Sequence, residues 1–185
     1  MGIPTLIKTQ TASNSASLDF VDGTSDVVLD GTYDEYMFVF TDINPATDNT
    51  HLGFQVNATD DAGGDYDTSL ITSTWFDAEQ NESGSSAGPI YNPNYDQAQG
   101  AAFQTISRGI GNGSDESAAG ILHLFNPSSA YVKHFYSRSN GMRYADYSID
   151  QFCAGYINDT TAIDEIQFKM SSGNFDGVIQ MYGIS

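Results

Sequence analysis

The stretch from Ala118 to Tyr182 constrains the fold more than any other part of the sequence. Short segments rich in Ile, Val, Phe and Tyr follow one another there, with no helical pattern between them. The turns that separate them carry Asn, Asp, Gly and Pro, which favour tight reversals of the chain. The segments are Ile121–Phe125, Tyr131–Arg138, Gln151–Ile157, Ile163–Met170 and Val178–Tyr182. This pattern predicts an antiparallel all-β fold, a sandwich or a barrel.

Earlier segments extend the same pattern. Tyr36–Ile43 is apolar on both faces, so we expect a central strand covered on two sides. His51–Asn57 alternates, which predicts Leu52, Phe54 and Val56 inward and His51, Gln55 and Asn57 outward. Further strands are expected within residues 3–20, Val27–Leu29, Ser69–Phe76 and Phe103–Ile110. We therefore predict one β-sandwich domain over residues 1–185, with about ten strands and no substantial helix.

Two connections are predicted from local turn signals. Glu79–Gln99 contains Gly and Pro without a period, which indicates a long loop. Asn140-Gly141 is typical of a tight turn. For the hairpin Ile121–Arg138 we expect Phe125 opposite Tyr131. This register places His123 opposite Lys133, Leu122 opposite His134, and the two histidines on opposite faces.

The charge balance excludes several classes of function. Six Lys and Arg face 24 Asp and Glu, giving a net charge of −18. Phosphate contacts require cationic side chains, so we expect no direct nucleic-acid partner. No apolar run reaches the roughly 20 residues of a membrane helix, so we expect no membrane partner. The acidic side chains indicate a well-solvated surface.

No pattern in the sequence predicts catalysis or a cofactor. The three histidines lack metal-ligand spacing, and no GxSxG nucleophile motif occurs. Cys153 is the one cysteine, so we expect a buried thiol and no intrachain disulfide. Asp60–Asp67 is the best candidate for Ca²⁺, but a solvated acidic loop is the preferred interpretation. We expect a structural or binding protein and no enzyme, with no cofactor and no metal.

Aromatic and basic residues supply the candidate contact sites. Tyr91 and Tyr95 lie in the long predicted loop, where their rings suit a sugar or a protein partner. A second group, in a predicted loop over residues 137–147, has the Arg and Tyr composition of an interface hot spot. A third lies in the N-terminal segment, residues 1–17, which is low in charge and suits an assembly contact. The second and third groups are Arg138, Arg143, Tyr144 and Tyr147, and Ile3, Leu6 and Lys8.

Several segments resemble small virion proteins of tailed phages that infect aquatic bacteria. The matching residues are Leu6–Ser13, Leu18–Phe20, His123–Ser129, Val132–Phe135, Ala154–Asn158, Ala162–Phe168 and Gly183–Ile184. The resemblance implies a jelly-roll-like fold, an oligomer with a trimer as the expected form, and residence in a virion assembled in the host cytoplasm. It carries no catalytic residue.

Two functions follow from these expectations. The first is a capsid decoration (cement) protein that binds the major capsid protein on the outer capsid surface and stabilises the shell. Its shell contact would be the segment Ile3–Ser17. The alternative is a receptor- or glycan-binding module of a tail or head fibre, which would use the two predicted loops. No heptad repeat typical of a fibre shaft is present, which favours decoration.

Overall fold

The chain is an all-β protein, as the sequence predicts. The computed structural model describes residues 2–61, 64, 66 and 68–185. Over these residues it contains thirteen strands, with one 3₁₀ turn (Pro93–Tyr95) as the only helical element. The strands are β1 (Thr5–Ser15), β2 (Ser17–Val21), β3 (Glu35–Pro45), β4 (Thr50–Ala58), β5 (Ile71–Asn81), β6 (Ala87–Tyr91), β7 (Ala98–Gly100), β8 (Gln104–Ile110), β9 (Ala118–Phe125), β10 (Lys133–Arg143), β11 (Tyr147–Ile157), β12 (Ile163–Met170) and β13 (Phe175–Ile184).

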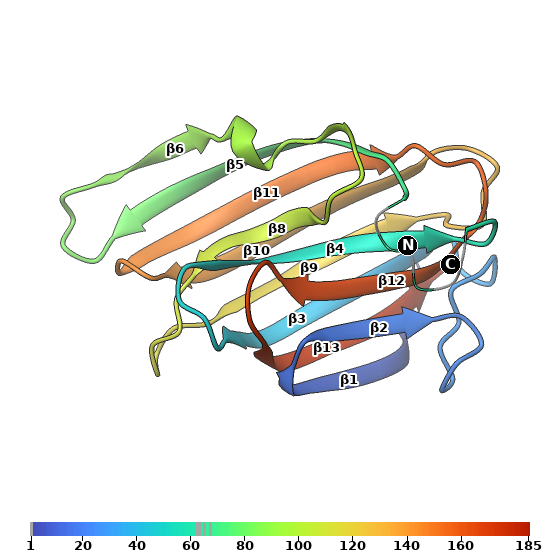
Figure 1. Cartoon of the computed structure of the whole chain (residues 1–185), viewed down its shortest axis with the longest axis horizontal. Helices are drawn as coiled ribbons and strands as arrows, with labels where there is room; N and C mark the ends of the chain where they lie inside the picture. Colours follow the sequence, from blue (N-terminus) through green and yellow to red (C-terminus); the bar gives the residue numbers. More distant parts are fainter. Residues whose placement is uncertain (1, 62–63, 65, 67) are drawn as a thin grey trace.

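Eight of these strands form a jelly roll. Four of them pair in the order β1-β13-β3-β9, and the other four pair in the order β2-β12-β4-β8. Consecutive strands of these eight alternate between the two sheets, except β4 and β8, which are neighbours in one sheet; this is the double Greek-key connectivity of a jelly roll. We call the sheet β2-β12-β4-β8 the small sheet. Figure 1 looks onto it, with the other sheet behind. All strand pairs are antiparallel.

Two insertions widen one sheet of the jelly roll. β10 and β11 are inserted between β9 and β12, and β5, β6 and β7 are inserted between β4 and β8. They continue the sheet in the order β9-β10-β11-β5, with β6 and β7 both paired to β5. We call this extension the wing. The sheet β1-β13-β3-β9 together with the wing is the large sheet. Figure 1 shows β11, β5 and β6 extending past the small sheet.

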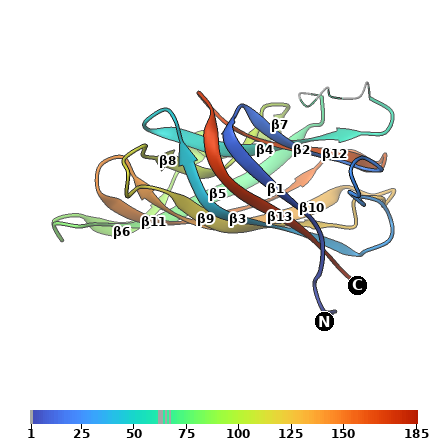
Figure 2. The same cartoon turned by 90° about the horizontal axis from the view of Figure 1, so that it is seen from below.

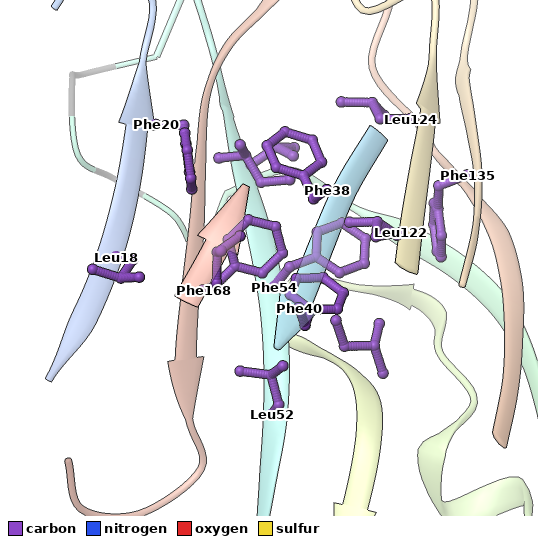
Figure 3. Close-up of a cluster of buried hydrophobic side chains, with 14 of the residues drawn as sticks. Leu18, Phe20, Phe38, Phe40, Leu52, Phe54, Leu122, Leu124, Phe135 and Phe168 are labelled. Carbon is purple, nitrogen blue, oxygen red and sulfur yellow. The ribbon is translucent and has the colours of Figure 1, made fainter. Parts of the chain in front are cut away.

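The core lies between the two sheets and is centred on Phe168. Its ring contacts Phe38 and Phe40 of the large sheet at centroid distances of 5.2 and 5.3 Å, and Phe20 and Phe54 of the small sheet at 6.2 and 6.4 Å. Figure 3 shows these rings meeting between the sheets. Such tilted and edge-on contacts are favoured by aromatic quadrupoles. The packing makes the sandwich a rigid support for its outer surfaces.

A buried ion network fastens the wing to the small sheet. Arg108 on β8 donates from Nε to Asp77 Oδ2 on β5 at 2.7 Å, and its NH2 lies 3.1 Å from Glu79 Oε2. Arg108 and Asp77 are 7 % and 1 % exposed, so removing one partner would leave a buried charge uncompensated. Burial raises the pKa of Asp77, against the opposing effect of Arg108.

β4 departs from the predicted alternation. Leu52, Phe54 and Val56 are buried as expected, but Gln55 and Asn57 are buried too, at 0 % and 2 % exposure. The sequence prediction that these two amides face outward is wrong. Gln55 Nε2 donates to the backbone oxygens of Ser69 and Ala101, because the chain that leads into and out of the wing covers this face.

The predicted register of the β9–β10 hairpin is also wrong. His123 pairs with Tyr136, three positions from the expected partner Lys133, and Leu122 pairs with Ser137. A longer connection that begins at Asn126, with φ of 46°, accounts for the shift. His123 and His134 consequently lie on the same face of the sheet, where the prediction had them on opposite faces.

Two predicted loops are instead strands. Asn140-Gly141 lies inside β10, because β9 and β11 pair with it on both sides; the turn comes later, at residues 144–146. Residues 79–99 fold mainly as the end of β5, β6, a 3₁₀ turn and β7. Val27–Leu29, predicted as a strand, is not one, although Val27 and Leu29 are buried. No helix in the described residues is long and apolar enough to cross a membrane.

Candidate functional site

The strongest candidate site is the face of the large sheet that points away from the core. We call it the outer face. Strand alternation places one residue in two on this face, and the cross-strand pairing arranges these residues in rows. One row is Leu6, Tyr182, Met37, His123, Tyr136, Ala154 and Thr74, and the next is Thr9, Gln180, Val39, Ile121, Arg138, Phe152 and Phe76. The outer face therefore combines many apolar side chains with few charges.

A stack of flat side chains crosses the wing in the second row. The Phe76 and Phe152 rings are nearly parallel, 8° apart, with centroids at 4.9 Å. Arg138 covers the Phe152 ring at 5.0 Å, so the guanidinium and both rings form three layers from β10 to β5. A cation above an aromatic ring is attracted to it. Phe76 remains 46 % exposed despite this packing.

A slot lies between the two rows on the wing. The side chains at Ala154 and Thr74 are short, whereas those at Phe152 and Phe76 are tall, so a hollow runs beside the stack. It has a volume of about 240 Å³ and an almost wholly apolar lining. Tyr136 closes the end toward β9. The lining residues are Thr74, Phe76, Tyr136, Ser137, Arg138, Phe152, Cys153 and Ala154.

The outer face of the wing carries no net charge. On the fully described strands β9, β10, β11 and β5, two outward positions carry a charged side chain, namely Arg138 and Asp150. They neutralise each other through two hydrogen bonds, of 3.0 Å from Nε and 2.7 Å from NH2. On the adjoining part of the sheet, Glu35 contacts the ring of His123. In a chain of net charge −18, this face can approach a partner without strong repulsion.

His123 and Tyr136 form a second aromatic pair beside the slot. Their rings are stacked at 4.4 Å, and Phe125 lies 5.7 Å from Tyr136. Tyr136 is 46 % exposed, so its ring is available to a partner. Exposed Tyr, Phe and Arg are the residue types enriched in protein interfaces.

The two predicted ligand-loop tyrosines lie in different environments. Tyr91 on β6 pairs with Phe76, is 60 % exposed and donates its hydroxyl hydrogen to the Asp96 carboxylate. Tyr95 packs on the core side, where its ring lies 4.9 Å from Trp75 and 5.3 Å from His51. The structure thus brings Tyr91 to the edge of the outer face and does not bring Tyr95 there.

The predicted Arg and Tyr group is divided as well. Arg138 belongs to the outer face, whereas Arg143 at the end of β10 forms a separate cluster with Tyr144 and Tyr147. The Arg143 guanidinium covers these two rings at 4.9 and 5.5 Å and lies 3.4 Å from the Glu79 carboxylate. This cluster closes the β10–β11 turn, so its contacts already serve the chain itself.

The predicted N-terminal contact residues point in several directions. Ile3 precedes β1 and is 89 % exposed, and Leu6 is 51 % exposed in a row of the outer face. Lys8 instead donates from Nζ to the backbone oxygen of Ser25 at 2.7 Å. β1 is an edge strand of the large sheet, so the predicted assembly segment and the outer face are continuous through Leu6.

Carboxylates gather at one further place. Among the described residues, Asp60, Asp61 and Asp159 form the one group whose potential metal-ligating atoms lie within 4.8 Å of one another. Thr161 Oγ1 donates to Asp60 and Thr68 Oγ1 donates to Asp61, so hydrogen bonds within the protein satisfy part of the cluster. Asp65 and Asp67 of the predicted Asp60–Asp67 ion loop lie outside the described residues. Exposed carboxylates of this kind are usually solvated.

Sequence reasoning missed Phe76 and Phe152 as surface residues. Both occupy strands that alternate, and each shares the phase of polar or small neighbours such as Thr74 and Ala154. That phase was the available signal, because an apolar residue in the outward phase must be exposed unless another layer covers it. Cys153 is buried below the slot, and burial raises the pKa of its thiol.

Comparison with known proteins adds no family. The sequence matches no protein-family model, and a search of curated proteins finds no relative. The fold and the outer face define the chain as a jelly-roll protein with a widened sheet and an aromatic surface that carries few charges.

Proposed function

We propose that this chain is a structural protein of a phage virion, a capsid decoration protein that binds the major capsid protein as an oligomer and stabilises the shell. The observation that supports this most strongly is the aromatic outer face with few charges, on a chain of net charge −18. Desolvating such a face costs little, whereas the acidic remainder stays in water. The charge distribution thus orients the molecule on its partner.

The rigid fold suits the same role. A decoration protein must hold several contact points at fixed distances, so that the free energy of many weak contacts adds up through avidity. The Phe-rich core between two sheets supplies this rigidity, and the wing enlarges the surface that one copy covers. Figure 2 shows the two sheets edge-on with the wing continuing the large sheet.

The first test is the abundance of the chain in purified virions. Quantitative mass spectrometry relative to the major capsid protein should give a near-stoichiometric ratio for a protein that covers the shell. A ratio of a few per cent would rule out decoration, because a shell cannot be clamped at a small fraction of its sites.

The second test adds charge to the outer face. Leu6→Asp should abolish binding to virions stripped of the protein, because Leu6 lies on the outer face and is 51 % exposed. Tyr131→Asp is the matched control, since Tyr131 is 79 % exposed and belongs to the β9–β10 connection, outside the strands of the sheet. Equal binding by both variants would exclude the outer face as the shell contact.

A second candidate function is glycan binding at the slot, in a receptor-binding module of a fibre. Phe76, Phe152 and Tyr136 supply aromatic surface, and the Arg138–Asp150 pair supplies hydrogen-bonding groups of both kinds. Neutral sugars use this combination. Low copy number in the virion together with retention on a glycan array, lost in Phe152→Ala, would favour this candidate.

A further inference from the structure

The slot on the wing and the segment before β1 are complementary in size, polarity and charge. The segment Gly2–Pro4, which we call the arm, contains Ile3, whose side chain is 89 % exposed. Gly2 lies against Ser185, and the arm leaves the sandwich beside the C-terminal residues (Figure 2). An apolar side chain so exposed gains free energy when another surface covers it. We propose that the arm of one copy docks on the wing of a second copy, with Ile3 in the slot.

Charge singles out the arm as the part of this chain that can approach another copy. Residues 2–18 contain no Asp or Glu, and Lys8 is their one charged residue, whereas the whole chain carries −18. The slot presents the neutralised Arg138–Asp150 pair and aromatic rings. Two acidic bodies repel each other, so a contact between copies is favoured where both surfaces lack acid.

The arm cannot fill the slot of its own chain. Leu6 and Tyr136 share a row of the outer face, but β13, β3 and β9 lie between their strands. Four steps of roughly 4.8 Å separate β1 from β10, about 19 Å in all, and the slot extends further to β5. Ile3 precedes Leu6 by three residues, a reach of about 10 Å. The occupant must therefore come from a second copy.

Pro4 prepares the arm for docking. A proline fixes its own φ and restricts the preceding residue, here Ile3, to extended conformations. An arm that is already extended loses less conformational entropy when it binds. The slot runs across β10, β11 and β5, and its apolar lining accommodates a branched aliphatic side chain.

The contact would be heterologous, because the arm and the slot are different surfaces. Heterologous contacts close into rings when the rotation between copies allows it. Each copy then completes the slot of its neighbour. The inference deepens the oligomer part of the proposed function, and it holds wherever the oligomer is attached.

Solution mass is the first measurement. Sedimentation velocity at physiological salt should show a concentration-dependent oligomer for the wild-type chain. Ile3→Asp and the slot-filling Ala154→Trp should each weaken association by roughly tenfold or more, because both prevent burial of the Ile3 side chain. Tyr131→Asp is the matched control and should leave the mass unchanged, since it places the same charge on another highly exposed apolar position.

Cross-linking locates the contact. In a Cys153→Ala background, a mixture of Ile3→Cys and Ala154→Cys chains should form a mixed disulfide under mild oxidation. A mixture of Ile3→Cys with Ser172→Cys should not, because Ser172 is exposed in the β12–β13 turn, away from the wing. A monomeric wild type at high concentration, or an unchanged mass for Ile3→Asp, would overturn the proposal. So would a slot that binds sugars while the chain stays monomeric.

The two proposals fail in different experiments. A low copy number in virions removes the decoration role and leaves the arm contact intact. A monomer in solution removes the arm contact, while the copy number still decides the decoration role.

Discussion

At the scale of single residues, buried polar groups decide how the wing joins the jelly roll. His51 Nδ1 accepts a hydrogen bond from the Gly109 backbone N–H at 2.8 Å, and the ring packs edge-on against Tyr95. Burial lowers the pKa of His51, and the nearby positive charge of Arg108 lowers it further, against a hydrogen bond with Thr50 that raises it. The folded state therefore favours the neutral ring of His51.

The free energy of unfolding should consequently fall as the pH drops below about 6.5. In that window the unfolded chain binds a proton at position 51 and the folded chain does not, so the loss is at most about 1.4 kcal/mol per pH unit. Urea unfolding at several pH values between about 5 and 7.5 measures it. The His51→Asn variant should lack this component, because the Asn amide oxygen accepts the same hydrogen bond without titrating.

The pH dependence of the wild type must be compared with that of a variant, because other groups change the free energy of unfolding in the opposite direction to His51. Burial raises the pKa values of Asp77 and Asp164, so protonating them at lower pH favours the folded state. These carboxyls are common to the wild type and His51→Asn, and their contribution cancels in the difference. His134→Asn, at an exposed position, is the matched control. Identical pH profiles for wild type and His51→Asn would contradict the assignment.

At the scale of elements, β11 is the strand that holds the wing together. It pairs along its length with β10 on one side and β5 on the other. At Gly155 the neighbouring atoms leave no room for a side chain: a Cβ there would lie 2.3 Å from the Thr72 backbone oxygen and 2.9 Å from Phe135 Cζ. Because backbone atoms cannot move aside cheaply, this position accepts no side chain without opening the sheet.

Gly155→Ala should destabilise the protein by about 1–3 kcal/mol, the usual cost of overpacking a well-filled site. Urea unfolding measures the change. The neighbouring Ala154 faces solvent, so Ala154→Ser should change the free energy of unfolding by less than about 0.5 kcal/mol. A Gly155→Ala variant as stable as the wild type would show that β5 and β11 separate more readily than their pairing indicates.

At the scale of the whole molecule, net charge opposes compactness. The charge of −18 on 185 residues produces self-repulsion that the core must outweigh. The melting temperature should therefore rise when NaCl increases from about 0.01 to 0.15 M, since the Debye length falls from about 30 to 8 Å over that range. Differential scanning calorimetry measures the shift.

Calcium chloride at equal ionic strength distinguishes screening from a specific site. If the carboxylates of Asp60, Asp61 and Asp159 are simply solvated, Ca²⁺ and Na⁺ should give similar shifts, because the Debye length depends on the ionic strength. Asp61→Asn should then behave like the wild type in both salts. A melting temperature independent of salt would contradict the view that self-repulsion limits the stability.

Which residues share the outer face can largely be predicted from the alternation along each strand, whereas the slot cannot. Tyr136 and Arg138 alternate with buried neighbours on β10, so their shared face follows from the period of two. The slot requires Phe152 beside Phe76 and Ala154 beside Thr74. These neighbours are set by the pairing of β11 with β5, two strands that lie far apart in the sequence. No local pattern specifies such a pairing.

The sequence by itself determined the all-β class, an antiparallel sandwich or barrel, and the uneven distribution of charge. Each of these follows from local alternation, turn residues and composition. The tertiary structure alone decided that Asn140-Gly141 continues a strand, that Gln55 and Asn57 are buried, and that Arg138 meets Phe152 while Tyr95 turns to the core. The physical reason is that strand partners and register depend on long-range pairing and packing, which outweigh local turn preferences once neighbouring strands cover both edges.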